Sequence, residues 1–156
     1  MSNKIDKPKS TSTSTPKLCT FEKAKVDTIN AIGEIETSVK LIRAKDSATA
    51  LLVFAHGAGA GMDHEFIVKI SALIAQHNIH VLCFNFPYMD KRKLDGKRRP
   101  PDRMPKLLAS YHQLLKETAL KISCEEQLPI FLGGKSMGSR VAVTFFSEDN
   151  ESENLE

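Results

Sequence analysis

The chain lacks the features that would mark a secreted or membrane protein. No apolar run reaches the length of about 20 residues that a membrane-spanning helix needs. The first residues, MSNKIDKPKSTSTSTPK, have no apolar core and therefore do not form a secretory signal. Cysteine occurs only at Cys19, Cys83 and Cys124, a scattered set that is typical of reduced thiols rather than of disulfides or a zinc site. We therefore predict a cytoplasmic protein with no membrane contact and no metal.

Charge of one sign is not in large excess, because the 156 residues carry a formal net charge of +3. The basic residues nevertheless gather in the segment Lys91–Arg103 and just after it. They are Lys91, Arg92, Lys93, Lys97, Arg98, Arg99, Arg103 and Lys106. This basic loop either binds an anionic partner or is a solvated loop that attracts an anionic substrate. Only Tyr88 is placed to stack on a base there, so we do not expect nucleic-acid binding.

The length fits one domain with its own core. Residues 1–22 are rich in Ser, Thr, Lys and Pro and bury too little apolar surface to fold, so we expect a disordered leader. Residues 23–147 contain the apolar segments of a folded domain, and residues 148–156 form an acidic tail.

Short apolar runs alternate with amphipathic segments in the domain. We predict a two-stranded antiparallel start between Ala24 and Arg43, followed by buried strands in ALLVFA, HVLCFNFP and PIFLGG. Helices are expected at 64–77, at 102–122 and from Met137 onward, with a long polar loop at 88–102. This order predicts an α/β fold, a mostly parallel sheet with helices on both faces.

The first two helices have expected caps and apolar faces. Asp63 and Asp102 are the expected N-caps, and Pro105 fits the first turn of the second helix. The apolar face of the first helix is Phe66, Ile70, Leu73, Ile74 and His77. The apolar face of the second is Leu107, Leu108, Tyr111, Leu114, Leu115 and Ile122.

Two glycine-rich turns resemble nucleotide sites but do not meet their requirements. In LPIFLGGKSMGSR, the phosphate-binding pattern G-x-x-x-x-G-K-[ST] needs a glycine where Pro129 stands. In GAGAGMDH, the dinucleotide fingerprint needs a small residue where Met62 or His64 stands. We therefore predict no nucleotide cofactor.

The turn around Ser136 matches a different pattern, G-x-S-x-G between a buried strand and a helix. This motif holds a serine on a sharp turn with positive φ, where only small residues fit two positions before and after it. Gly134 and Gly138 meet that requirement. The pattern predicts Ser136 as a nucleophile and the Met137 N–H as a donor to a developing oxyanion.

A second glycine-rich loop, HGAGAG, follows the strand ALLVFA. Hydrolases that use the G-x-S-x-G turn take another oxyanion donor from a loop of this kind. Gly57 and Gly59 allow the backbone to approach a substrate closely. We expect His56 to anchor this loop by hydrogen bonds to the backbone and not to act as a catalytic base.

Three segments, in this order between about Ala50 and Val143, resemble a known family: LLVFAHGAGAGMDHEF, FNFPYMDKRKLDGKRRPPDRMPKL and FLGGKSMGSRVA. They are similar to a bacterial predicted-hydrolase family within the α/β-hydrolases. That family is similar to the hydrolase-like region of subunit 3 of the chromatin-associated NSL complex and of a related testis-expressed protein. The resemblance implies the α/β-hydrolase fold, Ser136 as nucleophile, and oxyanion donors at the backbone N–H groups of Ala58 and Met137.

The expected catalytic base is missing, because no histidine follows Ser136. In this fold the nucleophile precedes first the acid and then the histidine. The acids between Glu148 and Glu156 follow Ser136 too soon to be the triad acid. A serine without a base is a poor nucleophile. We therefore expect the N-terminal part only of an α/β-hydrolase, incomplete or inactive as it stands, with the strand PIFLGG as an exposed edge.

Two functions stay open on this sequence. The first is a serine hydrolase that acts on a small-molecule acyl substrate such as an ester. The second is a non-catalytic hydrolase-like module that binds a protein partner through the basic loop.

Overall fold

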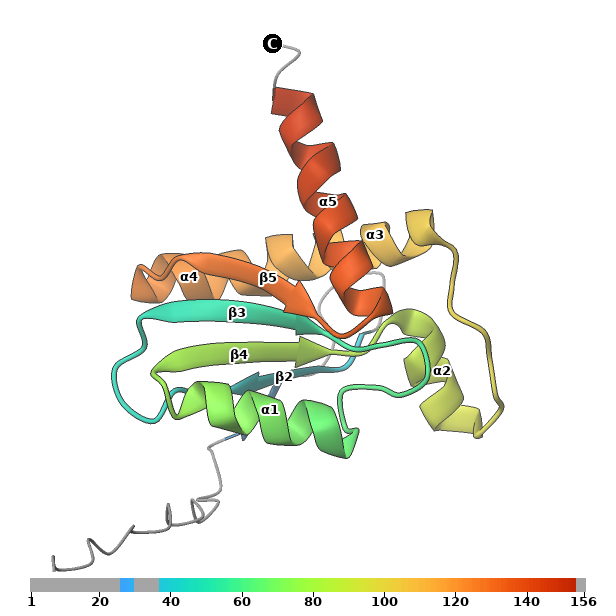
Figure 1. Ribbon diagram of the computed structural model, residues 1–156, viewed down its shortest axis with the longest axis horizontal. Helices are drawn as coiled ribbons and strands as arrows, with labels where there is room; N and C mark the ends of the chain where they lie inside the picture. Colours follow the sequence, from blue (N-terminus) through green and yellow to red (C-terminus); the bar gives the residue numbers. More distant parts are fainter. Residues whose placement is uncertain (1–25, 30–36, 154–156) are drawn as a thin grey trace, which may run out of the picture.

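The computed structural model describes residues 26–29 and 37–153, which form a five-stranded sheet with helices on both faces (Figure 1). The strands are β1 (Val26–Ile29), β2 (Val39–Ile42), β3 (Ala50–Ala55), β4 (Ile79–Phe84) and β5 (Ile130–Gly134). The helices are α1 (Glu65–Ala75), α2 (Pro87–Asp95), α3 (Met104–Leu114), the π-helix η1 (Leu115–Ala119), α4 (Leu120–Glu126) and α5 (Met137–Glu153). The predicted leader, 1–22, lies outside the described residues.

The strand order is β1-β2-β4-β3-β5. Strand β3 runs parallel to β4 and β5, whereas β2 is antiparallel to β1 and β4. The mostly parallel sheet and its antiparallel start are therefore confirmed. The register pairs Ala55 with both Phe84 and Gly134, so the carboxyl ends of β3, β4 and β5 meet at one edge. The loops that follow these strands are brought together there.

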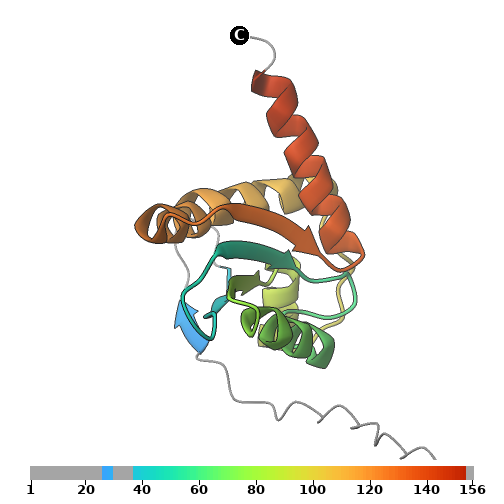
Figure 2. The same cartoon turned by 60° about the vertical axis from the view of Figure 1, so that its left-hand side comes forward.

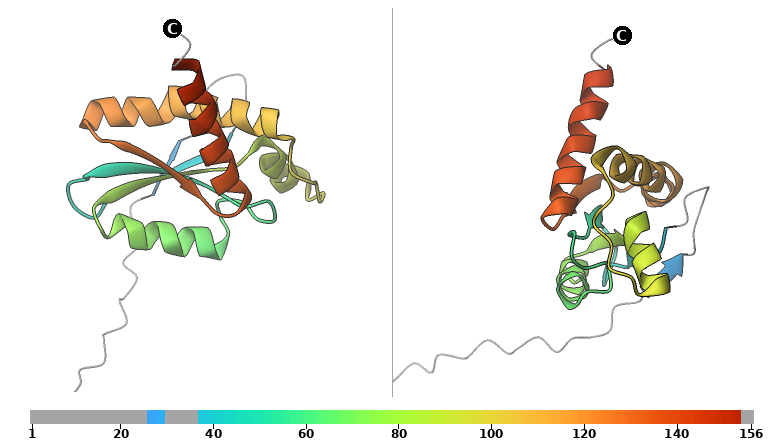
Figure 3. Two further views of the ribbon diagram at one scale, coloured as in Figure 1. Left: turned by 45° about the horizontal axis from the view of Figure 1, so that its top comes forward. Right: turned by 90° about the vertical axis from the view of Figure 1, so that its right-hand side faces the viewer.

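Alternating side chains of the sheet supply two cores, one on each face. On the face covered by α3, η1 and α5, Leu51 and Val53 of β3 pack with Leu82 and Phe84 of β4. On the face covered by α1, the core is smaller and contains Ile42, Met62, Ile67, Ala75, Val81 and Cys83. Figures 2 and 3 show the same two layers from other sides, with α5 leading away from the sheet.

Helix α1 buries only part of the face that its sequence predicts: Ile74 packs against the smaller core, and Ile70 is half-buried. Its buried residues are Ile67, Ser71, Ala72 and Ala75. Phe66 and Leu73, predicted for the apolar face, are 45% and 41% exposed. Small residues allow the helix to lie close to β4, where Ser71 Oγ is 3.2 Å from Cys83 Sγ. The buried face thus combines Ile67 with three small residues, which the predicted apolar face did not include.

The predicted polar loop at 88–102 is wrong for its first part, which forms helix α2. Pro87 occupies its first turn, where a missing N–H does no harm. Gly96, at a φ of 68°, ends it in the left-handed conformation that favours glycine. The helix lies beyond the carboxyl ends of β3 and β4 (Figure 1).

Helix α3 begins at Met104 with Pro105 in its first turn, as predicted, but Asp102 is not its N-cap. Arg103 holds that position, and Asp102 Oδ1 instead accepts a hydrogen bond from Lys106 Nζ at 2.8 Å. The predicted apolar face is confirmed, because none of its six residues is exposed. The prediction of one continuous helix missed the π-helical turn of η1.

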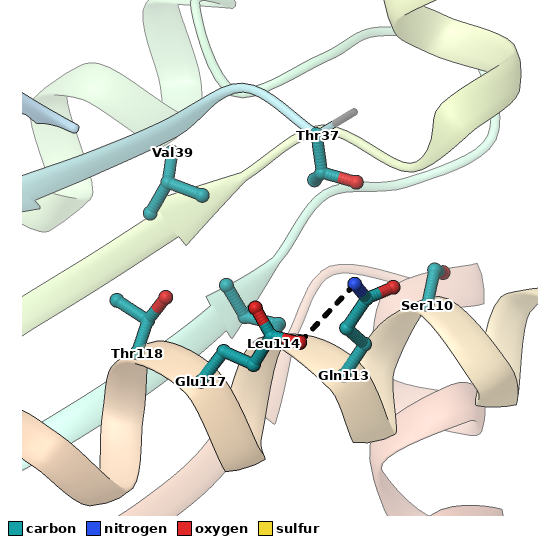
Figure 4. A pocket seen from close by; sticks show the side chains of 7 residues that line it. All are labelled: Thr37, Val39, Ser110, Gln113, Leu114, Glu117 and Thr118. Carbon is teal, nitrogen blue, oxygen red and sulfur yellow. Dashed lines mark hydrogen bonds between the residues drawn. The ribbon is translucent and has the colours of Figure 1, made fainter. Parts of the chain in front are cut away.

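A small cavity lies between this helical segment and β2 (Figure 4). Thr37 and Val39 face Ser110, Leu114 and Thr118 across it, and Gln113 points toward Glu117. Its volume of about 20 Å³ holds about one water molecule, so it is too small for a substrate.

Strand β5 forms one edge of the described sheet, and helix α5 follows it. Apolar side chains are exposed on both elements: Phe131 is 57%, Val143 66% and Phe146 63% exposed. Helix α5 continues through Glu153 and so includes much of the segment predicted as an acidic tail. None of the helices in 37–153 is long and apolar enough to cross a membrane.

The buried face of α1 can be tested by comparing Ile67→Ala with Leu73→Ala. Ile67 is 2% exposed, so its truncation leaves a cavity and should lower the free energy of unfolding by about 2–5 kcal/mol. Leu73 is 41% exposed, and its truncation should change stability by less than about 1 kcal/mol. Urea unfolding followed by circular dichroism measures both values. Equal losses would show that the helix is turned differently.

Candidate functional site

Ser136 lies on the turn between β5 and α5, at the carboxyl edge of the sheet. Its φ of 54° is one of three positive values for non-glycine residues among the described ones. A non-glycine residue in this conformation costs about 1–3 kcal/mol and persists only where its surroundings impose it. The side chain is exposed. The turn therefore presents the serine hydroxyl to solvent above the strand ends.

Glycine is required on both sides of this turn for steric reasons. A Cβ on Gly134 would lie 2.7 Å from the carbonyl oxygen of Ala55 and 2.7 Å from the carbonyl carbon of Gly138. A Cβ on Gly138 would lie 2.5 Å from the same Ala55 oxygen. These atoms belong to the backbone and have little room to move. The two glycines let the start of α5 lie directly against the end of β3.

Hydrogen bonds hold the turn in this position. The Lys135 N–H donates to the Ala55 carbonyl at 2.9 Å, which extends the β3–β5 pairing by one residue. Ser139 Oγ donates to the Gly134 carbonyl at 2.7 Å. The carbonyl of Ser136 accepts the Arg140 N–H at 3.2 Å, so the first turn of α5 begins at the serine itself.

The loop after β3 reaches Ser136 through Gly57. A Cβ on Gly57 would lie 3.3 Å from the Lys135 carbonyl oxygen and 3.9 Å from Ser136 Cβ. The two glycine-rich turns of the sequence, which are far apart along the chain, are thus in contact. Among the described residues, none accepts a hydrogen bond from the backbone N–H of Ala58 or of Met137.

His56 ties this loop to the end of β4. Its Nδ1–H donates to the Gly57 carbonyl at 2.7 Å, and its Nε2 accepts the Phe86 N–H at 3.0 Å. The ring is fully buried and lies edge-on to Phe86, with 5.1 Å between centroids. Burial holds the pKa of His56 below its ordinary value, although the bond to Gly57 opposes that shift. A neutral ring with both nitrogens bonded is a loop anchor.

Two side chains of α2 also hold the loop. The Tyr88 hydroxyl donates to the Ala58 carbonyl at 3.1 Å, and Arg92 donates to the Gly59 carbonyl at 3.1 Å. Burial, with the nearby charge of Asp102, raises the pKa of Tyr88 to about 12, so the hydroxyl stays a donor at neutral pH. These contacts of Tyr88 and Arg92 were not predicted from the sequence. The available signal was position, since both residues follow the strand that neighbours β3.

Asn85 completes the support of the loop and was also missed. Its Oδ1 accepts the Met62 N–H at 2.8 Å, and its Nδ2 donates to Asp90 Oδ1 at 2.8 Å. The other oxygen of Asp90 accepts the Ser38 N–H at 2.7 Å. A Cβ on Gly61 would lie 2.5 Å from Asn85 Oδ1, so a glycine is needed there.

The predicted N-cap of α1 is wrong. His64 is the N-cap, and its Nδ1 accepts the Phe66 N–H at 3.2 Å. Asp63 instead forms ion pairs with Lys40 and with Lys93, the latter at 2.8 Å. Burial alone would raise the pKa of Asp63, but the bonds from the two lysines outweigh it and hold the pKa low. The Asp63 carboxylate thus binds the two lysines and not the N-terminus of α1.

Neither Lys135, which precedes Ser136 in the sequence, nor His77 or His80 is placed as a base for it. Lys135 Nζ lies 4.4 Å from the centroid of the Phe66 ring, a cation–π contact with α1. His80 accepts the Ala44 N–H at 2.8 Å and lies 2.8 Å from a Glu126 oxygen. His77 lies at the opposite end of the sheet, just before β4 begins.

A groove of about 540 Å³ lies along the glycine-rich loop after β3, between Gly59–Gly61 and helix α2. Its volume is within the range of small-molecule sites. Met89 supplies apolar surface, and Arg92 and Lys93 supply positive charge. Within 26–29 and 37–153, no group of three His, Cys, Asp or Glu side chains could hold a metal ion.

A family model for the alpha/beta hydrolase domain matches residues 48–154, which include every element from β3 to α5. The chain belongs to the alpha/beta hydrolase family. No curated protein sequence gives a significant match to it.

Solved structures of alpha/beta hydrolases share this fold. Dienelactone hydrolase from Anabaena variabilis is 19% identical with a TM-score of 0.61, and the match covers 83% of this chain and 60% of that one. Est1E from Butyrivibrio proteoclasticus is 14% identical with a TM-score of 0.60, covering 81% and 46%. Brefeldin A esterase, described as a bacterial homologue of human hormone-sensitive lipase, is 16% identical with a TM-score of 0.59, covering 94% and 40%.

The chain thus spans between 40% and 60% of the length of these three structures. At such low sequence identities the likeness shows the fold and not the activity.

The contact between β3 and the serine turn can be tested by comparing Gly138→Ala with Gly59→Ala. The methyl group at 138 would overlap the Ala55 carbonyl, so the free energy of unfolding should fall by about 2 kcal/mol or more. Nothing lies within 4 Å of the corresponding position at Gly59, and this substitution should change stability by less than about 0.5 kcal/mol. Thermal and urea unfolding of both variants measure the difference. A stable Gly138→Ala protein would contradict the packing of this turn.

The neutral state of His56 predicts a pH dependence of stability. Below its ordinary pKa of about 6.5 the unfolded chain binds a proton at His56 that the folded chain does not, so stability falls as pH drops toward the lower folded-state pKa. The His56→Gln variant lacks this pH-dependent part of the stability, while its other groups titrate as in the wild type. The stability difference between wild type and variant should therefore shrink from pH 7.5 to pH 5. Urea unfolding at several pH values tests this, and a constant difference would contradict it.

Proposed function

We propose that this chain carries the nucleophile and oxyanion site of a serine hydrolase that acts on an ester-like or other acyl substrate. The observation that carries the proposal is the strained conformation of Ser136, which is imposed by the close contact of Gly134 and Gly138 with β3. Asn78 and Gln127 also have a positive φ, but Ser136 is distinguished by its place between β5 and α5, where its turn contacts Gly57 of the glycine-rich loop. The resemblance of the sequence to a bacterial predicted-hydrolase family also supports Ser136 as the nucleophile.

In the proposed reaction Ser136 Oγ attacks the acyl carbonyl carbon, and its proton passes to a base. The carbonyl oxygen becomes an oxyanion. Collapse of this intermediate expels the alcohol, which takes up a proton, and leaves the acyl group on the serine. Water then releases the acid by the reverse sequence of bonds. The chain contributes the position of the nucleophile and of the groups around the oxyanion.

The proposed oxyanion donors are the backbone N–H groups of Met137 and Ala58. Met137 is the first residue of α5, so its N–H has no acceptor within the helix. The Ala58 N–H belongs to the glycine-rich loop, in which the preceding residue, Gly57, contacts the turn of Ser136. His56, Tyr88 and Arg92 hold that loop in place by hydrogen bonds, and such pre-organised donors need no rearrangement during the reaction.

The base is the component that the described residues do not place beside Ser136. His56 and His80 have both ring nitrogens bonded, and the His64 ring caps α1. His112 lies on α3 with its ring 6.1 Å from that of Phe145. We therefore expect the chain alone to react far more slowly than a hydrolase with a complete triad.

A second candidate function is a non-catalytic hydrolase-like module that binds a protein partner through the basic loop. One observation favours it: the exposed residues of the basic loop include Lys91, Lys97 and Arg98. This function requires an intact fold but not a reactive serine.

Labelling with a fluorophosphonate probe separates the two functions. An activated serine forms a covalent phosphonyl adduct, so we expect slow labelling of wild type at Ser136, located by peptide mass spectrometry. Ser136→Ala should not be labelled, and Ser110→Ala, at a buried serine on α3, should be labelled as wild type.

The labelling must also disappear on unfolding in urea, because it depends on the turn and not on the hydroxyl alone. A folded wild-type chain that does not react at all would disprove the nucleophile and favour the binding module.

A further inference from the structure

The groove between the glycine-rich loop after β3 and helix α2 has a chemical character that points to a class of ligand. One wall is the backbone of Gly59, Ala60 and Gly61, and the opposite wall is helix α2. The buried Met89 and the side chains of Arg92 and Lys93, all on α2, line the groove. Small-molecule sites are commonly apolar with a few fixed polar groups, and this groove follows that pattern.

The charges of the groove do not cancel. Asp63 is the acidic residue in its lining, and it accepts hydrogen bonds from both Lys93 and Lys40. Asp90, on the inner side of α2, uses its two oxygens for Asn85 and the Ser38 N–H. The cations Arg92, Lys93 and Lys40 therefore outnumber these two carboxylates, so the groove has an excess of positive charge.

Arg92 is the cation best placed to bind an anion. One of its guanidinium nitrogens, Nη1, donates to the Gly59 carbonyl at 3.1 Å, which fixes the side chain along the groove. A guanidinium carries five N–H donors, and this bond uses one of them. No carboxylate of the described residues forms an ion pair with Arg92. Its planar donor set matches a carboxylate or phosphate.

The groove is also close to the serine. Its wall at Gly59 lies two residues after Gly57, which contacts the Ser136 turn. Two residues span at most about 7 Å of extended chain. An acyl group with a short spacer could therefore place its carbonyl at Ser136 and its far end beside Arg92.

We propose that this groove binds an anionic group of the substrate, with Arg92 as the principal ligand, so that the substrates are acyl esters that carry a carboxylate or phosphate. The inference rests on the proposed function for the reaction itself, but the binding can be measured without any turnover. Lys93 contributes charge at the rim, and Met89 contacts the apolar spacer.

The test is an NMR titration of the ¹⁵N-labelled chain with monomethyl succinate, which carries one carboxylate, and with its neutral counterpart dimethyl succinate. We expect monomethyl succinate to shift the amide signals of Gly59 and Gly61 and to bind about tenfold more tightly than the neutral ester, the effect of one charge-assisted hydrogen bond. Methyl phosphate serves as a second anion, and the tighter of the two anions identifies the preferred group.

Three variants locate the charge that matters. Arg92→Gln should weaken monomethyl succinate binding about tenfold, and Arg92→Lys should restore part of the loss. Lys91→Gln removes the same charge from the same helix outside the groove, and its binding should change by less than about twofold. Equal binding of the neutral ester, or equal losses in Arg92→Gln and Lys91→Gln, would overturn the proposal.

Competition with the fluorophosphonate probe separates this inference from the proposed function. If Ser136 is labelled and monomethyl succinate slows that labelling, both are supported. If Ser136 is not labelled but the anion still binds through Arg92, the hydrolase proposal fails and the anion site stands. If Ser136 is labelled and the two esters bind alike, only the anion site is disproved.

Discussion

The site depends on a backbone contact between the end of β3 and the turn that carries Ser136. The Ala55 carbonyl accepts the Lys135 N–H at 2.9 Å, and a side chain on Gly134 or Gly138 would overlap the same oxygen. Backbone atoms in paired strands cannot move aside, so the two glycines are a steric requirement. The contact fixes where α5 begins and forces Ser136 to a φ of 54°. A serine in this conformation follows from the packing of three backbone segments and not from its own preference.

The second constraint is the attachment of the glycine-rich loop to its neighbours. Glycines make this loop small enough to approach the serine, but they give it no side chains with which to hold its shape. Residues after β4 supply the missing bonds: Phe86 through His56, Tyr88 to Ala58, and Arg92 to Gly59. The loop is thus positioned by an element that follows it in the chain, and parallel strand order makes that possible.

The basic segment has several separate roles in the structure. Arg99 pairs with Asp95, and Lys106 pairs with Asp102, so part of the charge stabilises the segment locally. Such exposed pairs contribute little to overall stability. Arg92 and Lys93 instead face the groove on α2. The cations that are clustered in the sequence therefore have two different places in the fold: some form local ion pairs, and others line the groove near the site.

The sequence by itself determined the sheet and the serine turn. Buried parallel strands are continuous apolar runs, and the G-x-S-x-G spacing expresses a steric rule that acts within five residues. Only the tertiary structure decided which face of α1 is buried, that the segment after Pro87 is helical, and that Asp63 pairs with lysines instead of capping a helix. These features depend on residues distant in sequence: Cys83 beneath Ser71, Lys40 and Lys93 around Asp63, and the strand ends under α2. Local pattern contains no information about such partners, because it is the packing of the sheet that brings them together.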